Sequence, residues 1–102
     1  MTIEIKTAGN ETVMEVIGRL DTGTAPVLDK KLLAEVPETA NLTLDLKGLE
    51  YISSAGLRVL LSAQKRMQKA GSMKLKNVRE EVMDVFEMTG FAEILVIEQW
   101  NW

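Results

Sequence analysis

Two adjacent serines, Ser53 and Ser54, stand directly before a segment with helical spacing of apolar residues. The next two residues, Ala55 and Gly56, are small, so a bulky group can approach the backbone there. The first amides of a helix lack intrahelical partners and lie at its positive end. This turn therefore suits either an ordinary serine N-cap or an anion-binding or phosphorylation site. The two interpretations are compatible, because the helix dipole tolerates a phosphate at this position.

A second polar loop, Arg19–Thr24, precedes another predicted helix and contains Asp21, Thr22 and Thr24. In open α/β sheets, ligand contacts gather beyond the carboxyl ends of the parallel strands, where we expect both loops. The side chains of this loop suit a strand-to-helix turn, and they also suit the second edge of a contact surface shared with the serines. A phosphate adds about −1.5 to −2 charges to such a surface, which would stop a partner from packing on it.

Composition argues against several classes of function. The chain has no cysteine and no histidine, so it has no disulfides, lacks the usual soft metal ligands and lacks His-dependent nucleophiles. No acid–base pair stands out and neither Gly-rich nucleotide motif occurs, so we expect no enzymatic activity, no cofactor and no bound metal. The net charge of −3 argues against a nucleic-acid partner.

The apolar pattern predicts an α/β fold. Alternating and short apolar runs predict strands over 2–8, 11–18, 42–46, 73–76 and 93–97. Helical spacing predicts helices over 26–36, 55–70 and 79–89. The expected apolar faces of the first two helices are Leu28, Leu32, Leu33 and Val36, and Leu57, Leu60, Leu61, Gln64 and Met67. The order β-β-α-β-α-β-α-β predicts a mixed, mostly parallel sheet of about five strands flanked by helices.

The length of 102 residues suits one domain, which we place over 1–102. No stretch approaches the roughly 18 apolar residues of a membrane span. Residues 1–6 include an acid and lack an apolar run, unlike a signal peptide. We therefore expect a cytoplasmic protein. For the oligomeric state we expect either a monomer or a weak dimer. Trp100 and Trp102 are unusual so close to the end of the sequence, and their role stays open.

The segment Asp45–Leu61, DLKGLEYISSAGLRVLL, resembles the signature of the STAS domain, which occurs in sulfate transporters and bacterial anti-sigma factor antagonists. In that family a strand ends in Asp-Leu, and Asp-Ser/Thr-Ser/Ala-Gly-Leu opens a helix. The segment Gly18–Asp21 is similar to the family's Gly-x-Leu-Asp after the second strand, and Thr89–Phe91 is similar to one of its turns. Element order and length also match, so the resemblance covers nearly the whole chain.

The resemblance implies a regulatory binding protein. Stand-alone members bind an anti-sigma factor that is also a serine kinase, and so release a sigma factor. The kinase phosphorylates a loop serine or threonine, which blocks binding, and a phosphatase resets the switch. In several members the acceptor directly precedes the glycine, where this chain has Ala55, and Ser53 stands where many members have Asp. Other members have Ser-Ala-Gly with the acceptor one position earlier, which makes Ser54 the expected acceptor and Ser53 the second choice.

The two loops and the resemblance together place the expected partner contacts at Asp21, Thr22, Thr24, Ser53, Ser54, Ala55, Gly56, Leu57 and Arg58. The leading hypothesis is an anti-sigma factor antagonist that phosphorylation of Ser54 switches off. A second hypothesis stays open, a constitutive STAS subunit of a bacterial lipid-transport ABC complex or of another signalling scaffold, because some single-domain STAS proteins that resemble this one are such subunits. Ala55 in place of an acceptor suits that second role.

Overall fold

The computed structural model describes residues 1–98, so the open question about Trp100 and Trp102 lies outside the described residues. The strands are β1 (Thr2–Ala8), β2 (Glu11–Leu20), β3 (Asn41–Asp45), β4 (Leu49–Ile52), β5 (Ser72–Lys76) and β6 (Ile97–Glu98). The helices are α1 (Ala25–Glu35), α2 (Ser54–Met67) and α3 (Glu80–Thr89), followed by the 3-10 helix η1 (Phe91–Glu93).

The sheet is mixed, as predicted. Its strand order is β1-β2-β3-β5-β6, and β4 pairs with β2 outside this path. β1 and β2 form an antiparallel hairpin, and the other pairings among residues 1–98 are parallel. β2 is long enough to pair with β3 through its first half and with β4 through its last residues. The carboxyl ends of β2 and β4 therefore lie next to each other.

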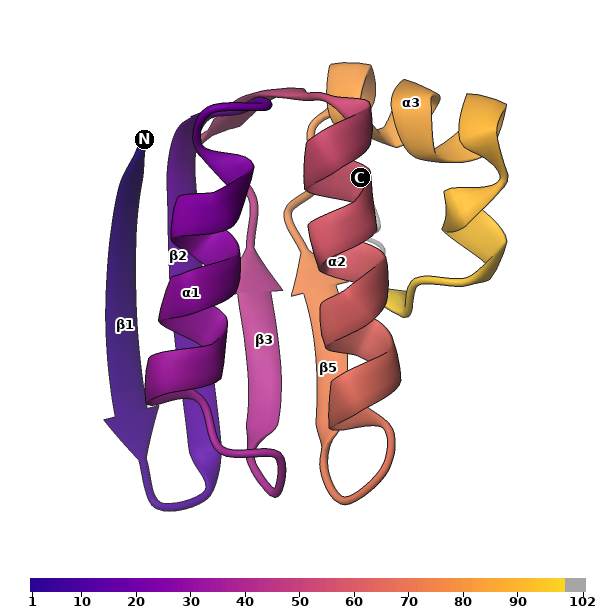
Figure 1. Ribbon diagram of the computed structural model, residues 1–102. Coiled ribbons are helices and arrows are strands. Elements are labelled where there is room, and N and C mark those ends of the chain that lie inside the picture. Colours follow the sequence, from indigo (N-terminus) through magenta and orange to yellow (C-terminus); the bar gives the residue numbers. More distant parts are fainter. Residues whose placement is uncertain (99–102) are drawn as a thin grey trace.

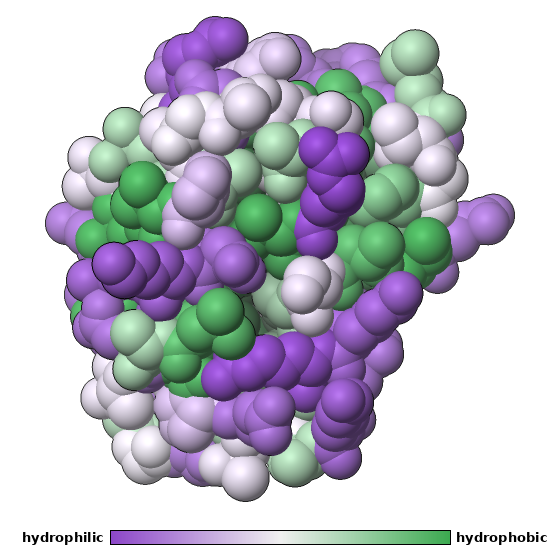
Figure 2. Space-filling view, in the orientation of Figure 1, coloured by the Kyte–Doolittle hydropathy of each residue, from purple (hydrophilic) through white to green (hydrophobic). Residues whose placement is uncertain are grey.

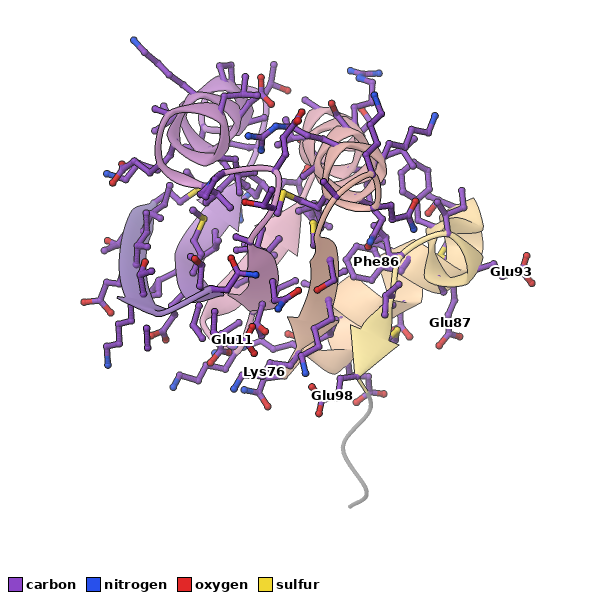
Figure 3. The ribbon with its side chains drawn as sticks, turned by 90° about the horizontal axis from the view of Figure 1, so that it is seen from below. Glu11, Lys76, Phe86, Glu87, Glu93 and Glu98 are labelled. Carbon is purple, nitrogen blue, oxygen red and sulfur yellow. The ribbon has the colours of Figure 1, made fainter. Side chains whose placement is uncertain are left out.

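Helices α1 and α2 cover one face of the sheet, side by side (Figure 1). Viewed from below, the opposite face carries charged side chains, including those of Lys76 and Glu98 (Figure 3). Helix α3 lies past the end of β5 and packs against β4, and the ring of Phe86 on α3 is fully buried. The parallel strands thus end at one open edge, from which α1 and α2 both start.

The core lies between the sheet and the two covering helices. Alternate residues of β2, such as Met14 and Val16, are fully buried, because successive strand residues point to opposite faces. On α2, Leu57, Leu60, Gln64 and Met67 form the predicted buried face. Burial of each large apolar side chain contributes roughly 1.5–3 kcal/mol before entropy is counted. This packing fixes where α2 begins relative to the sheet.

Two predicted strand assignments were wrong. Residues 47–54 were expected to be a connection, but Leu49–Ile52 forms β4, in which the first and last residues are buried and the middle two are exposed. Four residues with that pattern show no alternation, so periodicity missed them. A strand was expected over 93–97, but Gly90, at φ 81°, ends α3 and the chain continues into η1 before the short β6.

Helix boundaries and one helix face differ from the prediction. Both ends of α1 and the start of α3 differ by one residue. Helix α2 begins at Ser54 rather than Ala55 and ends at Met67 rather than at position 70. Residues 68–70 form a turn, and Gly71 follows it at a point where a Cβ would collide with the carbonyl oxygen of Ala40. Leu33 was expected on the buried face of α1 but is 59% exposed, because the buried line of α1 runs through Ala25, Leu28 and Leu32 and leaves Leu33 to one side.

Candidate functional site

Two loops meet at the edge where β2 and β4 end, at the top of Figure 1. Leu20 and Ile52 lie opposite each other in the parallel pairing. One residue later, the backbone amide of Ser53 donates a hydrogen bond to the carbonyl oxygen of Leu20, with an N···O distance of 2.9 Å. The loop 21–24 and the segment 53–56, called the serine turn from here on, therefore lie together. The two loops that the sequence analysis identified as candidate contact sites are thus neighbours in the structure.

Ser53 is the N-cap of α2. Its backbone is extended, with φ −95° and ψ 173°, and its hydroxyl oxygen accepts a hydrogen bond from the backbone amide of Gly56 at 3.3 Å. This contact satisfies one of the amides that the first helical turn leaves without a partner. Ser53 is half-buried, so its hydroxyl has a structural task inside the protein.

Ser54 is the first residue of α2, and it is exposed. Unlike that of Ser53, its hydroxyl makes no hydrogen bond to any part of residues 1–98. The first turn of α2 contains no acidic residue that would repel a negative group. A helix N-terminus stabilises such a group by about 0.3–1 kcal/mol. The hydroxyl of Ser54 is thus accessible, uncommitted and placed where a negative charge is tolerated.

Gly56 and Leu57 shape the serine turn from below. A Cβ on Gly56 would lie 2.8 Å from Cγ of Leu20 and 2.9 Å from Cγ1 of Ile52, which is too close for real side chains. Leu57 is only 5% exposed and belongs to the core. Both residues were expected to contact a partner directly, but their burial instead gives them a packing role that holds the first turn of α2 against the sheet.

Asp21 and Thr24 close the second loop with internal hydrogen bonds. The Asp21 carboxylate accepts from the backbone amides of Gly23 and Thr24, each at 3.0 Å, and lies 3.1 Å from the Thr24 hydroxyl. That hydroxyl also donates to the carbonyl oxygen of Arg19 at 2.8 Å and accepts from the Asp21 amide at 2.8 Å. These two side chains therefore build the turn, whereas Thr22 is exposed and lines the groove described below.

These hydrogen bonds hold the pKa of Asp21 below its ordinary value of 3.8. The backbone amide of Thr24 is the main cause, followed by its hydroxyl, and the amide of Gly23 and the charge of Arg19 act in the same direction. Desolvation opposes the effect but is outweighed. The carboxylate is therefore ionised at neutral pH and keeps its hydrogen bonds there.

An open groove with a volume of 480 Å³ lies between the N-terminal parts of α1 and α2. Three of the predicted contact residues, Thr22, Ala55 and Arg58, line it. Figure 2 shows hydrophobic side chains in the seam between these helices, bordered by hydrophilic ones. The groove joins the serine turn to the loop 21–24, so the two form one continuous surface.

The rest of the groove was not predicted from the sequence. Its further lining residues are Ala25, Pro26, Asp29, Val59 and Ser62. They lie on the flanks of α1 and α2, between the buried and the outward faces. Helical periodicity separates buried from exposed positions, but only knowledge that α1 and α2 are neighbours would have identified these flanks as facing each other.

Residues 1–98 contain neither a cluster of metal ligands nor a helix fit to cross a membrane. Within residues 1–98, no group of carboxylates is arranged to hold a metal ion. None of the helices described has the length and apolar character needed to cross a bilayer. Every fully buried side-chain nitrogen or oxygen in this part of the chain has a hydrogen-bond partner. The site is therefore defined by an exposed surface rather than by a buried polar cluster.

This fold and this helix-leading turn define a known class of domain. The sequence profile of the STAS domain family matches residues 2–100, so the chain belongs to the STAS family, as the segment 45–61 predicted. The chain is 33% identical, over 96 residues, to the anti-sigma-B factor antagonist of Bacillus subtilis strain 168. That alignment covers 93% of this chain and 88% of the relative. The prediction of a non-enzymatic protein is confirmed, because such relatives are regulatory binding proteins.

Solved structures show the same fold. An anti-sigma factor antagonist from Mycobacterium paratuberculosis superimposes with a TM-score of 0.86 at 22% identity, covering 97% of this chain and 86% of that one. The Bacillus cell fate determinant SpoIIAA, in its phosphorylated form, superimposes with a TM-score of 0.71 at 17% identity, covering 96% and 92% of the two chains. At these identities the likeness concerns the fold.

Proposed function

We propose that this protein is an anti-sigma factor antagonist whose contact surface is the serine turn, the loop 21–24 and the adjoining groove. The name of the relative from Bacillus subtilis supports this role. The residues that offer accessible atoms are Thr22, Ser54, Ala55 and Arg58. The remaining residues of the predicted site hold that surface in shape, and they are Asp21, Thr24, Ser53, Gly56 and Leu57.

Phosphorylation of Ser54 switches this surface off. The observation that carries the proposal is that the two serines have different environments. Ser53 caps α2, whereas the Ser54 hydroxyl is exposed and makes no hydrogen bond within residues 1–98. A phosphate on Ser54 leaves the cap intact and adds about −1.5 to −2 charges at the partner's docking point. Binding is therefore lost without refolding of the antagonist. A phosphate on Ser53 would instead replace a half-buried capping hydroxyl.

The proposed partner is an anti-sigma factor with serine kinase activity, in the cytoplasm. It transfers the γ-phosphoryl group of ATP to the Ser54 oxygen, which loses its proton, and ADP is released. A separate phosphatase hydrolyses the phosphoserine with water and restores the binding form. The antagonist itself supplies the acceptor hydroxyl and the surface, and the nucleotide belongs to the kinase.

Phosphosite mapping tests the switch. The purified protein is incubated with its cognate kinase and ATP, and the modified residue is located by mass spectrometry. We expect phosphate on Ser54 in the wild type and in Ser53→Ala, and none in Ser54→Ala. Phosphate on neither serine would sink the switch but leave the binding role intact, and phosphate on Ser53 alone would overturn the assignment of the acceptor.

Ala55 favours one alternative, a constitutive STAS subunit of a lipid-transport ABC complex. Ala55 directly precedes Gly56 and lines the groove, and its side chain has no hydroxyl that could be phosphorylated. A partner that docks on Ala55 would therefore stay bound permanently. Affinity purification from the native cell separates the two roles. Recovery of a histidine-kinase-like ATPase together with a sigma factor supports the antagonist, whereas recovery of an ABC ATPase supports the subunit.

A further inference from the structure

Ser54 and Arg58 lie one helical turn apart on the outer side of α2. Both are exposed, and residues four positions apart on a helix have Cβ atoms about 5–6 Å from each other. We infer that Arg58 is the internal counter-charge for a phosphate on Ser54, an inference that rests on the proposed function. It assigns a positioning role to a residue outside the serine turn itself.

The other arginines of the chain are already engaged. The Arg19 guanidinium lies over the ring of Tyr51, 4.2 Å from its centroid. Arg66 donates to the carbonyl oxygen of Val36 at 2.7 Å, and Arg79 donates to the carbonyl oxygen of Lys47 at 2.8 Å. Their guanidinium groups serve the packing of the fold.

Arg58 differs from them. Its guanidinium has no hydrogen bond, ion pair or ring contact with any residue that the structure describes. Asp29 lines the same groove from α1, yet the two form no ion pair within residues 1–98. An exposed guanidinium without an anion presents its forked donors to the solvent, and a phosphate accepts such donors in pairs. A phosphate on the same helix, one turn away, is positioned to take them.

The pair changes the groove as well as the serine turn. In the unmodified protein Arg58 gives the α2 wall of the groove a positive charge. A phosphate dianion beside it turns the local sum from +1 to about −1 and engages the guanidinium donors. A partner that used Arg58 as a cationic contact then loses that contact at the same time as it meets the phosphate.

Titration of the phosphate tests the pairing directly. Phosphoserine is placed at position 54 during translation, and the second pKa of the phosphate is followed by phosphorus NMR in the wild type, Arg58→Gln, Arg58→Lys and Lys65→Gln. Lys65 is the matched control, because it is an exposed cation on α2 two turns beyond Arg58. Since a neighbouring cation favours the dianion, the second pKa of the phosphate in the wild type and in Lys65→Gln should lie about 0.15–0.4 units below that in Arg58→Gln. Arg58→Lys should lie between them.

Two outcomes would overturn the inference: equal pKa values for the wild type and Arg58→Gln, or an equal increase in the pKa for Lys65→Gln and Arg58→Gln. Circular dichroism confirms that each variant is folded before titration. The measurement needs neither kinase nor partner, so its failure can be distinguished from a failure of the proposed function. A kinase that ignores Ser54 contradicts the proposed function and leaves the titration valid, whereas equal pKa values remove the role of Arg58 and leave the switch standing.

Discussion

The backbone amide of Ser53 donates a hydrogen bond to the carbonyl oxygen of Leu20, with an N···O distance of 2.9 Å. Leu20 is the last residue of β2 and Ser53 is the residue that caps α2. Since buried backbone groups are costly to leave unpaired, this bond ties the ends of β2 and β4 together. The loop 21–24 and the serine turn are therefore held as one surface, although the 28 residues 25–52 lie between them in the sequence.

The two serines should differ in their effect on stability. Ser53→Ala removes the acceptor of the Gly56 amide and should lower the free energy of unfolding by about 1 kcal/mol, the usual cost of a lost N-cap. Ser54→Ala removes an exposed hydroxyl and should change it by less than about 0.5 kcal/mol. Urea denaturation of both variants measures the difference, and an equal or larger loss for Ser54→Ala would contradict the assignment of the cap.

Close packing under the serine turn makes Gly56 intolerant of a side chain. The added methyl of Gly56→Ala meets Leu20 and Ile52, so the free energy of unfolding should fall by about 1–3 kcal/mol. Gly23→Ala is the matched control, because its Cβ meets only the Asp21 carboxylate, at an ordinary 3.5 Å. Thermal and urea unfolding should show little change for Gly23→Ala. Equal stability of the two variants would show that the first turn of α2 can shift away.

The pH dependence of stability should carry the signature of Asp21. Its pKa is lowered by folding, so between that lowered value and 3.8 the unfolded chain binds more protons than the folded one. The stabilising contribution is therefore complete above about pH 4 and is lost as the pH falls through the folded pKa. Asp21→Asn should consequently be most destabilising near neutral pH and least so in acid. Urea denaturation from about pH 2 to 7 checks this, and a constant difference from the wild type would contradict it.

Gln64 should anchor the C-terminal segment. It is 1% exposed, its amide nitrogen donates to the carbonyl oxygen of Met73 at 3.1 Å, and its amide oxygen accepts from the Val96 amide at 3.2 Å. Gln64→Leu leaves both backbone groups unpaired and should cost about 1–3 kcal/mol. The exposed Gln68→Leu is the control, with an expected change of less than about 0.5 kcal/mol. Hydrogen exchange at Val96 should accelerate only in Gln64→Leu, and unchanged exchange there would refute the anchor.

Sequence patterns predicted the parts of the fold that local physics determines. Apolar residues alternate in β2 because one face of the strand is buried. They recur at helical spacing in α2, at Leu57, Leu60 and Met67, because one side of the helix is buried. The structure confirms both buried faces. β4 was missed because a four-residue strand with buried ends carries no period. The last strand was misplaced because the apolar run 94–97 includes the exposed Ile94 and Val96, which lie in the irregular segment between η1 and β6.

The site was predictable to a similar degree. The serine turn and the loop 21–24 could be found because polar side chains before helices are visible in the sequence. Which serine caps α2 depends on the backbone angles of Ser53, which no residue pattern specifies. Leu57 was expected both on the apolar face of the helix and among the partner contacts, and its 5% exposure places it in the core. The groove depends on the contact between α1 and α2, which is a tertiary property.

The central claim is that a phosphate on Ser54 separates this protein from its anti-sigma factor. Calorimetric titration of the cognate anti-sigma factor with the unmodified protein and with the protein phosphorylated at Ser54 tests it directly. The Ser54→Ala variant, treated with kinase, is the control and should bind like the unmodified protein. We predict tight binding of the unmodified form and a loss of at least about a hundredfold on phosphorylation, or roughly 2.8 kcal/mol. Equal affinities of the two forms would contradict the account.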